Sequence, residues 1–287
     1  MNKKKHRVAE KYIEKALMIC AAVFIIAIII ISLFIFARGI PLINKVGLGE
    51  FIFNLNWLPT RGSFGIGAMF IGTLAVTLTA LLWAVPLGLL TAIFIAEIAP
   101  RKAGQVMAEL VSLLAGIPSV VYGFLGLLVI VPYIREHLGG NGLSILAGAI
   151  ILGIMILPTI INISRDAILA VPEDYKINSL ALGASHHQTI GRVVLPAACS
   201  GIITAIVLGM GRAVGETMAV VMVTGNSTIF PDSILSPVRT MTSNIVLEMG
   251  YATGDHQAAL FATGVVLFIF IVLLNLSVNI ARNRGAE

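Results

Sequence analysis

The sequence predicts an all-α, polytopic membrane protein with six transmembrane helices. Of its 287 residues, 58% are hydrophobic and 11% are charged, and the mean hydropathy is +0.99. A soluble globular protein has about 25% charged residues, so this composition places the chain in a bilayer. A spanning helix needs roughly 20 predominantly apolar residues. The stretches that meet this requirement are Ala16–Ala37, Ala68–Ile95, Leu110–Val131, Ile145–Ile163, Gly201–Val223 and Ala258–Ile280.

Basic residues are distributed unevenly between the two sides that these spans define. Thirteen of the nineteen Lys and Arg residues lie on the side that holds both termini, five lie on the other side, and Arg212 falls within a span. Positive charge marks the cytoplasmic face of a membrane protein. We therefore expect a multi-pass membrane protein with both termini on the cytoplasmic side. Because topology accounts for the net charge of +5, the charge does not indicate a nucleic-acid partner.

The first 64 residues are expected to form a cytoplasmic N-terminal segment (1–15), then the first transmembrane helix with an outer loop (16–64). The first apolar run is longer than the 7–15 residues of a signal-peptide core, so an uncleaved anchor is expected. The outer loop carries the aromatic residues Phe51, Phe53, Trp57 and Phe64. Such rings suit the membrane interface, where they sit half wet, and a short surface helix is predicted at Gly49–Asn56.

The third span is interrupted by Gly116 and Pro118, just before Ser119. Proline removes a backbone hydrogen bond and breaks a helix, and lipid cannot satisfy the backbone groups that are freed. In transporters, broken helices at the middle of the membrane mark solute sites, because the N-terminus of a half-helix favours an anion. A packing kink is the alternative.

A polar segment, 171–196, follows the fourth span and is too charged to lie in lipid. Pro172 at a first helical position, followed by Glu173 and Asp174, predicts a helix start. Gly183 fits the position after a helix end, where the backbone turns left-handed. Ser185 and Gln188 have the spacing of a capping box, which predicts a second short helix. The expected unit is a helix, a glycine turn and a helix on the cytoplasmic face.

The fifth span contains small residues at every fourth position: Gly201, Ala205, Gly209, Ala213 and Thr217. Small residues let membrane helices approach closely, so this span is expected to be central and to face a partner.

The same span carries two charged residues, Arg212 and Glu216. Each charge costs roughly 2.5–3.5 kcal/mol at the centre of a membrane helix, so the pair requires an explanation. Residues four apart on a helix can neutralise each other, which would be a structural role. The functional alternative is that Arg212 attracts an anion and Glu216 prevents it from being held too tightly.

Nothing in the sequence indicates catalysis. It has no G-x-x-x-x-G-K-[ST] loop for ATP, and no Ser/His/Asp, H-E-x-x-H or C-x-x-C arrangement. Neighbouring side chains on a helix do not converge, so His186 and His187 are not expected to bind a metal. Cys20 and Cys199 are interpreted as packing residues. We therefore predict neither an enzyme nor a cofactor site.

Within GASHHQTIGRVVLP, the positions of Gly183, Val193, Leu195 and Pro196 match G-x(9)-[IV]-x-L-P. This pattern resembles the cytoplasmic motif of ABC importer permeases, although Ile177 stands where that family has a glutamate. The stretches WLPTRGSFGIGAMFIGTL, VPLGLLTAIFIAEIAP, LLAGIPSVVYGFLGL, GRAVGETMAVVMVTGN and RTMTSNIVLEMG are similar to the PstC-type permease of bacterial phosphate importers. The similarity extends over nearly all of the chain after residue 50.

This resemblance implies a permease domain at 65–287 that carries inorganic phosphate inward. It implies as partners a second homologous permease of the PstA type, two ATP-binding subunits at the cytoplasmic face and an extracytoplasmic phosphate-binding protein. The coupling residues that it implies are Gly183, Ala184, Ser185, Leu195 and Pro196. The expected substrate pathway includes Arg212, Glu216, Gly116, Pro118 and Ser119. A sulfate or molybdate permease, a secondary anion transporter and a purely structural membrane subunit are the alternatives.

Overall fold

The computed structural model describes residues 3–284, with side chains described for residues 13–277. In this part of the chain, six helical runs are long and apolar enough to cross a membrane: Ile13–Val46, Gly67–Ile98, Ser119–His137, Ile145–Leu169, His186–Gly215 and Gly254–Ser277. The predicted number of spans is confirmed. The predicted bounds are furthest off for the third span, which is Ser119–His137, and for the fifth, which is His186–Gly215. In both places the helix is broken.

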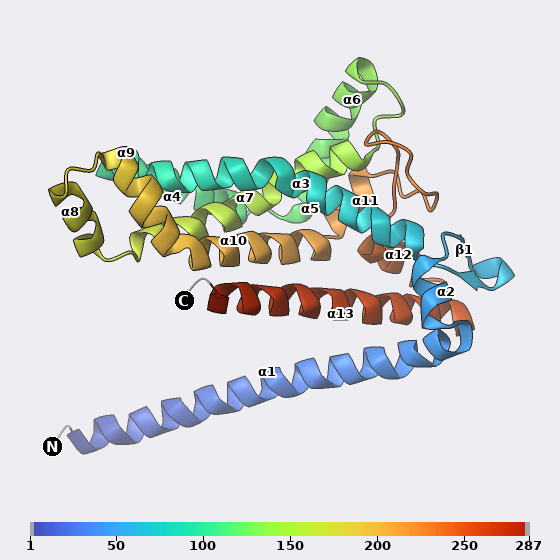
Figure 1. Cartoon of the computed structure of the whole chain (residues 1–287). Coiled ribbons are helices and arrows are strands. Elements are labelled where there is room, and N and C mark those ends of the chain that lie inside the picture. Colours follow the sequence, from blue (N-terminus) through green and yellow to red (C-terminus); the bar gives the residue numbers. More distant parts are fainter. Residues whose placement is uncertain (1–2, 285–287) are drawn as a thin grey trace.

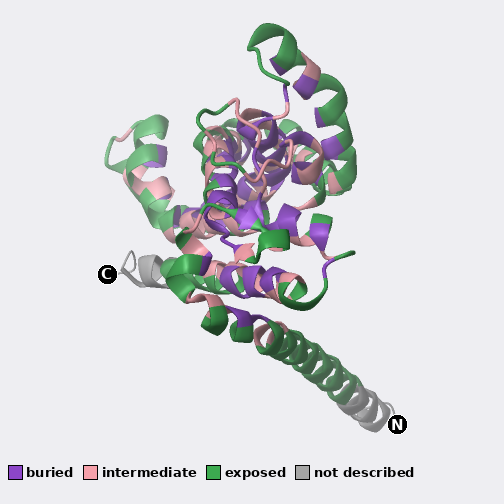
Figure 2. Cartoon of the chain, turned by 90° about the vertical axis from the view of Figure 1, so that its right-hand side faces the viewer, coloured by how far each residue is buried: buried purple, intermediate pink, exposed green. Residues whose placement is uncertain are grey.

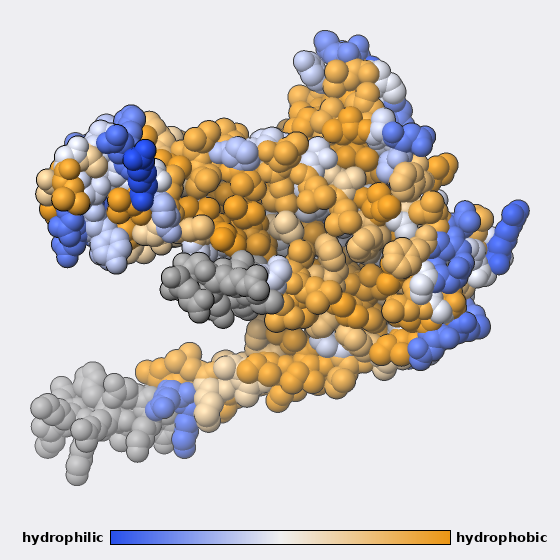
Figure 3. All heavy atoms as spheres, in the orientation of Figure 1, coloured by the Kyte–Doolittle hydropathy of each residue, from blue (hydrophilic) through white to orange (hydrophobic). Residues whose placement is uncertain are grey.

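The helices run between two polar ends, and hydrophobic residues dominate the surface between them (Figures 1 and 3). One end carries α8 (Glu173–Ala181) and α9 (His186–Thr189). The start of α1 and the end of α13 point toward this end (Figure 1). The other end, the hairpin end, carries the antiparallel strands β1 (Trp57–Leu58) and β2 (Ser63–Phe64). This arrangement agrees with the prediction that both termini share one side with segment 171–196.

Helix α1 (Lys3–Val46) lies against α13 (Gly254–Arg284) near the hairpin end and diverges from the bundle toward its own start (Figure 1). A Cβ at Gly39 would lie 2.8 Å from the backbone nitrogen of Ala262, so glycine permits this close approach. Phe34 packs edge-to-face on Phe261 with ring centroids 5.5 Å apart. Farther along α1 the apolar side chains are exposed, for example Leu17 at 65%, as lipid-facing residues are.

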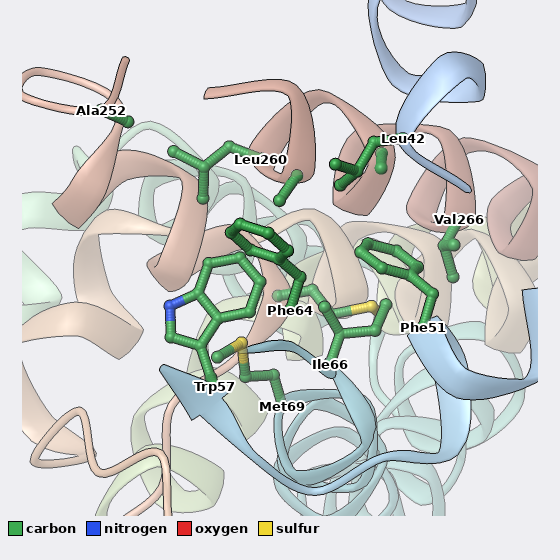
Figure 4. Packing of buried hydrophobic residues seen from close by; sticks show 12 residues of the cluster. Leu42, Phe51, Trp57, Phe64, Ile66, Met69, Ala252, Leu260 and Val266 are labelled. Carbon is green, nitrogen blue, oxygen red and sulfur yellow. The ribbon is translucent and has the colours of Figure 1, made fainter. Parts of the chain in front are cut away.

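A compact apolar cluster fills the hairpin end (Figure 4). It joins α2 (Leu48–Phe53), the hairpin with its tip η1 (Pro59–Arg61), α3 and α13. The predicted short helix is present as α2. The prediction of half-wet aromatic residues is wrong for three of the four, because Phe51, Trp57 and Phe64 are 0%, 5% and 6% exposed. Only Phe53 among them is exposed. The strand pairing of Trp57 with Phe64 turns both rings into this cluster.

The centre of the bundle is the pair formed by α3 (Gly67–Ile93) and α7 (Ile145–Leu169), where buried residues concentrate (Figure 2). The indole of Trp83 lies on Gly153, where a Cβ would be 2.1 Å from a ring carbon. A Cβ at Gly88 would lie 2.9 Å from Ile160. Close packing in lipid depends on such small residues. A π-helical turn, η2 (Phe94–Ile98), continues α3 toward the α8–α9 end.

The remaining elements complete the two interrupted spans. Before the third span lies α4 (Arg101–Ala115), and the span itself consists of α5 (Ser119–Leu125), η3 (Gly126–Ile130) and α6 (Val131–His137). The fifth consists of α9, η4 (Ile190–Val194) and α10 (Leu195–Gly215), after which α11 (Met218–Val223) follows a break. Helix α12 (Met241–Glu248) precedes α13.

Candidate functional site

The polar segment 171–196 forms the predicted helix, glycine turn and helix. Helix α8 begins after Pro172 with Glu173 and Asp174 in its first turn. Gly183 has φ +88° and nothing within 4 Å of an added Cβ, so the turn requires glycine for its backbone and not for space. The Ser185 side chain accepts from the Gln188 backbone, and the Gln188 side chain accepts from the Ser185 backbone. The glycine turn and the capping box are confirmed, whereas Pro172 is the N-cap residue before α8 and not its first helical residue.

This segment is joined to the fifth span without a loop. Helix α9, η4 and α10 form one helical run from His186 to Gly215. Leu195 and Pro196 open α10 directly after the π-helical turn η4. Ala184 is half-buried just before the capping box. The capping box after the glycine turn and Arg212 therefore lie on one continuous helical run.

Arg212 lies near the end of α10 and is exposed. Its Nη1 donates to the Thr159 hydroxyl of α7 at 3.3 Å, which is its one hydrogen bond within the described part of the chain. No carboxylate in that part forms an ion pair with it. Within the described residues the guanidinium is therefore anchored to α7 alone.

Glu216 does not continue the helix that carries Arg212. Its backbone is extended (φ −68°, ψ 136°), and α10 ends at Gly215. The carboxylate accepts from the backbone nitrogen of Ala219 at 3.3 Å, capping α11, while its carbonyl accepts from the Thr242 hydroxyl at 2.9 Å. The structural alternative of an Arg212–Glu216 pair on a continuous helix is therefore wrong, because the break points the two side chains to different partners.

The predicted break at Gly116 and Pro118 is confirmed between α4 and α5. Pro118 precedes α5 with φ −59° and ψ 140°, the extended backbone that ends one helix before the next starts at Ser119. The Tyr122 hydroxyl donates to the Leu114 carbonyl at 2.9 Å and so satisfies a group that the break frees. Gly116 and Pro118 are exposed, and Ser119 is half-buried.

The two broken helices are neighbours, because α5 packs on α11. A Cβ at Gly123 would lie 2.9 Å from the Ala219 Cα. The structure thus brings together the two interruptions that the sequence places about a hundred residues apart.

The small-residue stripe on α10 faces this chain and not a partner. A Cβ at Gly201 would lie 2.4 Å from Ala167, and one at Gly209 would lie 3.0 Å from Ile160, both on α7. Ala205 and Ala213 are buried on the same side. Gly211 and Gly215 have nothing within 4 Å of an added Cβ. The open face of α10 is therefore the one with Gly211 and Gly215, not the one with the predicted stripe.

A buried charge network at the hairpin end was missed by sequence reasoning. Glu248 accepts from Trp57 Nε1 at 2.9 Å and from His256 Nε2 at 2.7 Å, and it pairs with Arg239 at 2.5 Å. Arg239 also donates to the Asn226 carbonyl and the Asn244 side chain, both at 3.0 Å. The stretch that holds Arg239 and Glu248 was recognised only by its resemblance, because nothing local joins it to Trp57.

Metal and cofactor binding find no support in the described residues. They contain no group of three or more His, Cys, Asp or Glu side chains that could hold an ion. His186 and His187 lie with ring centroids 6.3 Å apart and tilted, and His186 instead contacts the Glu97 carbonyl. Cys20 and Cys199 are free and exposed.

Residues 84–284, which include segment 171–196 and both helix breaks, match the family of binding-protein-dependent transport system inner membrane components. The chain belongs to this family. The permease is 44% identical over 266 residues to the probable ABC transporter permease protein YqgH of Bacillus subtilis (strain 168), covering 89% of this chain and 86% of that protein.

Other relatives of the permease are named as phosphate transport proteins. It is 35% identical over 286 residues to the phosphate transport system permease protein PstC of Xylella fastidiosa (strain 9a5c), covering 92% of this chain and 88% of that protein. It is 30% identical over 277 residues to the probable PstC of Methanocaldococcus jannaschii, covering 88% and 87%. These relatives are subunits of transport systems, and the permease is a multi-pass inner membrane protein.

Solved structures support the fold. An inward-facing structure of the MetNI methionine ABC transporter matches with a TM-score of 0.62 and 20% identity, covering 81% of this chain and 98% of that one. A bacterial ABC transporter for the acidic polysaccharide alginate matches with a TM-score of 0.62 and 16% identity, covering 94% and 96%. At these identities the likeness establishes the ABC permease fold alone.

Proposed function

We propose that this permease carries inorganic phosphate across the cytoplasmic membrane as one half of the pathway of an ATP-driven importer. The observation that carries the proposal is Arg212, an exposed guanidinium held only by Thr159 beside two helix breaks. An intramembrane cation with free donors suits an oxyanion. The named PstC relatives over most of the chain favour phosphate among the oxyanions.

Each pathway residue has a proposed role. Arg212 attracts the anion through its free donors. Glu216, which is half-buried at the next break, limits how tightly the anion is held and can accept a hydrogen bond from a protonated phosphate. Gly116, Pro118 and Ser119 form the second break, at which α5 begins. The open face of α10, with Gly211 and Gly215, is where a second homologous permease of the PstA type would complete the pathway.

The coupling residues are proposed to receive force from two ATP-binding subunits. Tyr175, Ile177, Leu180 and Leu182 expose 52%, 54%, 46% and 89% of their surface on or next to α8. Apolar side chains exposed beyond the membrane indicate a docking surface. Gly183, Ala184 and Ser185 form its turn, and Leu195 and Pro196 pass the motion into α10. An extracytoplasmic binding protein would dock at the hairpin end.

The proposed organisation is a cytoplasmic segment (1–15), a first helix with its outer loop (16–64) and a permease domain (65–287) with both termini inside. The charge asymmetry supports this orientation.

The deciding experiment reconstitutes the permease with its partner permease, ATPase and binding protein in proteoliposomes. ATP hydrolysis and anion uptake are then measured with phosphate, sulfate and molybdate. We expect phosphate alone to stimulate both activities. Stimulation by sulfate or molybdate without phosphate would assign the permease to another oxyanion, and uptake without ATP would indicate a secondary transporter.

A further inference from the structure

Helix α8 is held to the rest of the chain by very little packing. It has no buried residue, and its large apolar side chains are exposed. By contrast, η4 on the other side of the glycine turn buries Ile190 and Val194. Since burial of apolar surface is the main source of packing energy, α8 needs another attachment if it is to transmit force.

That attachment is Glu97, in the π-helical turn that ends the α3 run. Lys176 of α8 places its Nζ 2.6 Å from Glu97 Oε1. His186 of α9 places its Nε2 3.1 Å from the Glu97 carbonyl. Among the side-chain hydrogen bonds of the described residues, these two are the ones that join segment 171–196 to the rest of the chain.

The Lys176–Glu97 pair is shielded from water. The side chain of Glu97 is 5% exposed and that of Lys176 is 19% exposed. The pair borders a cavity of about 830 Å³ whose other charged or titratable lining residues are Arg101, Arg165, Glu173 and His186. Exposed pairs contribute little, but removing one partner of a buried pair leaves an uncompensated charge.

A rigid path leads from Glu97 into the bundle. Glu97 belongs to the run that continues α3, α3 packs along α7, and α7 carries the Thr159 hydroxyl that holds Arg212. The close contact of Trp83 with Gly153 fixes α3 against α7. A push on α8 can therefore reach Arg212 through α3 and α7 as well as through α10.

We propose that Lys176 and Glu97 are positioning residues that form a strut between the coupling helix and α3. The inference rests on the proposed function, because it assigns α8 to docking of the ATPase. Loss of the strut leaves α8 docked but moving without the bundle. ATP hydrolysis then continues while less anion is carried per ATP.

The test uses the complete reconstituted complex and measures phosphate taken up per ATP hydrolysed. Lys176→Gln and Glu97→Gln should each lower this ratio by about tenfold, a loss of about 1.4 kcal/mol of coupling free energy. Lys176→Arg keeps the charge pair and should retain the wild-type ratio. The double neutral variant should be no worse than the worse single variant. Lys45→Gln removes an exposed pair, with side chains 65% and 55% exposed, and should change nothing.

Three results would each overturn the strut. They are wild-type ratios in both single variants, losses that multiply in the double variant, and uncoupling by Lys176→Arg. If the single variants fail to assemble because one charge is left unpaired, the double variant decides: a ratio about tenfold below wild type supports the strut, and a wild-type ratio overturns it. A second readout does not depend on the substrate: spin labels at Asn178 and Lys102 should give a narrow distance distribution that broadens in both single variants. If wild-type complex takes up no phosphate, the proposed function fails, and this distance still tests the strut.

Discussion

The indole Nε1 of Trp57 donates a 2.9 Å hydrogen bond to the carboxylate of Glu248, 191 residues further along the chain. This contact joins the β1–β2 hairpin to α12. With Arg239 and His256 on the same carboxylate, Glu248 ties four separate segments of the hairpin end together. The network shields charges that would otherwise be costly to bury.

Glu248→Ala should strongly destabilise the permease, because it leaves Arg239 buried without its anion. Breaking a buried pair costs about 3–5 kcal/mol, whereas Trp57→Phe should cost about 1 kcal/mol for one lost hydrogen bond. The measurement is thermal unfolding of the purified permease in detergent. Asp255→Asn breaks the exposed Lys45–Asp255 pair and serves as the control, with an expected change within about 0.5 kcal/mol. If Glu248→Ala and the control unfold at the same midpoint temperature, the network does not contribute to the stability of the permease.

Gly153→Ala should also destabilise the permease, because the Cβ of the new alanine would lie 2.1 Å from the Trp83 ring. Overpacking of this kind costs about 1–3 kcal/mol. Trp83→Leu should restore much of the loss in the double variant, since it removes the obstructing ring. Gly211→Ala is the matched control on an open helix face. The same thermal assay applies, and a Gly153→Ala variant as stable as Gly211→Ala would contradict the close α3–α7 packing.

Local signals in the sequence predict local structure well here. Gly183, Ser185 and Gln188 sit within six residues, and their turn and capping chemistry decides the backbone without help from elsewhere. Pro118 likewise breaks its helix by itself. The break at Glu216 has no proline, and it depends on Thr242, which lies 26 residues away and satisfies the freed carbonyl. Neither this contact nor the burial of Trp57 leaves a periodic pattern, so only the folded chain reveals them.

Gly183→Val should weaken coupling while the permease still inserts. The site has φ +88° and open space around it, so the expected penalty of about 1 kcal/mol or more comes from backbone strain alone. Gly183→Asn should be milder, because asparagine tolerates left-handed backbone. Gly191→Ala, at a helical glycine with equally open surroundings, is the control. Phosphate uptake and phosphate-stimulated ATP hydrolysis are measured. Normal values in Gly183→Val would remove the turn from the coupling mechanism.

The orientation can be tested by labelling single cysteines in intact cells after Cys20 and Cys199 are replaced by serine. Ser185→Cys, which is exposed at the α8–α9 end, should be shielded from an impermeant thiol reagent. Asp232→Cys, which is exposed before α12, should react. The charge asymmetry requires this result. Labelling of Ser185→Cys in sealed cells, with Asp232→Cys protected, would reverse the assigned orientation.

Arg212→Gln should lower phosphate uptake by at least about tenfold, because a hydrogen bond to a charged group contributes about 1.5–3 kcal/mol. Its single hydrogen bond to Thr159 contributes little to folding, so assembly and the phosphate affinity of the binding protein should be unchanged. Thr159→Val removes that anchor but keeps the charge, and a smaller loss of uptake is expected. Arg38→Gln, at an exposed arginine that lies over the Phe34 ring of α1, should have no effect on uptake.

A complex that fails to assemble with Arg212→Gln would assign Arg212 a structural role. An assembled complex that transports at the wild-type rate would place Arg212 outside the pathway.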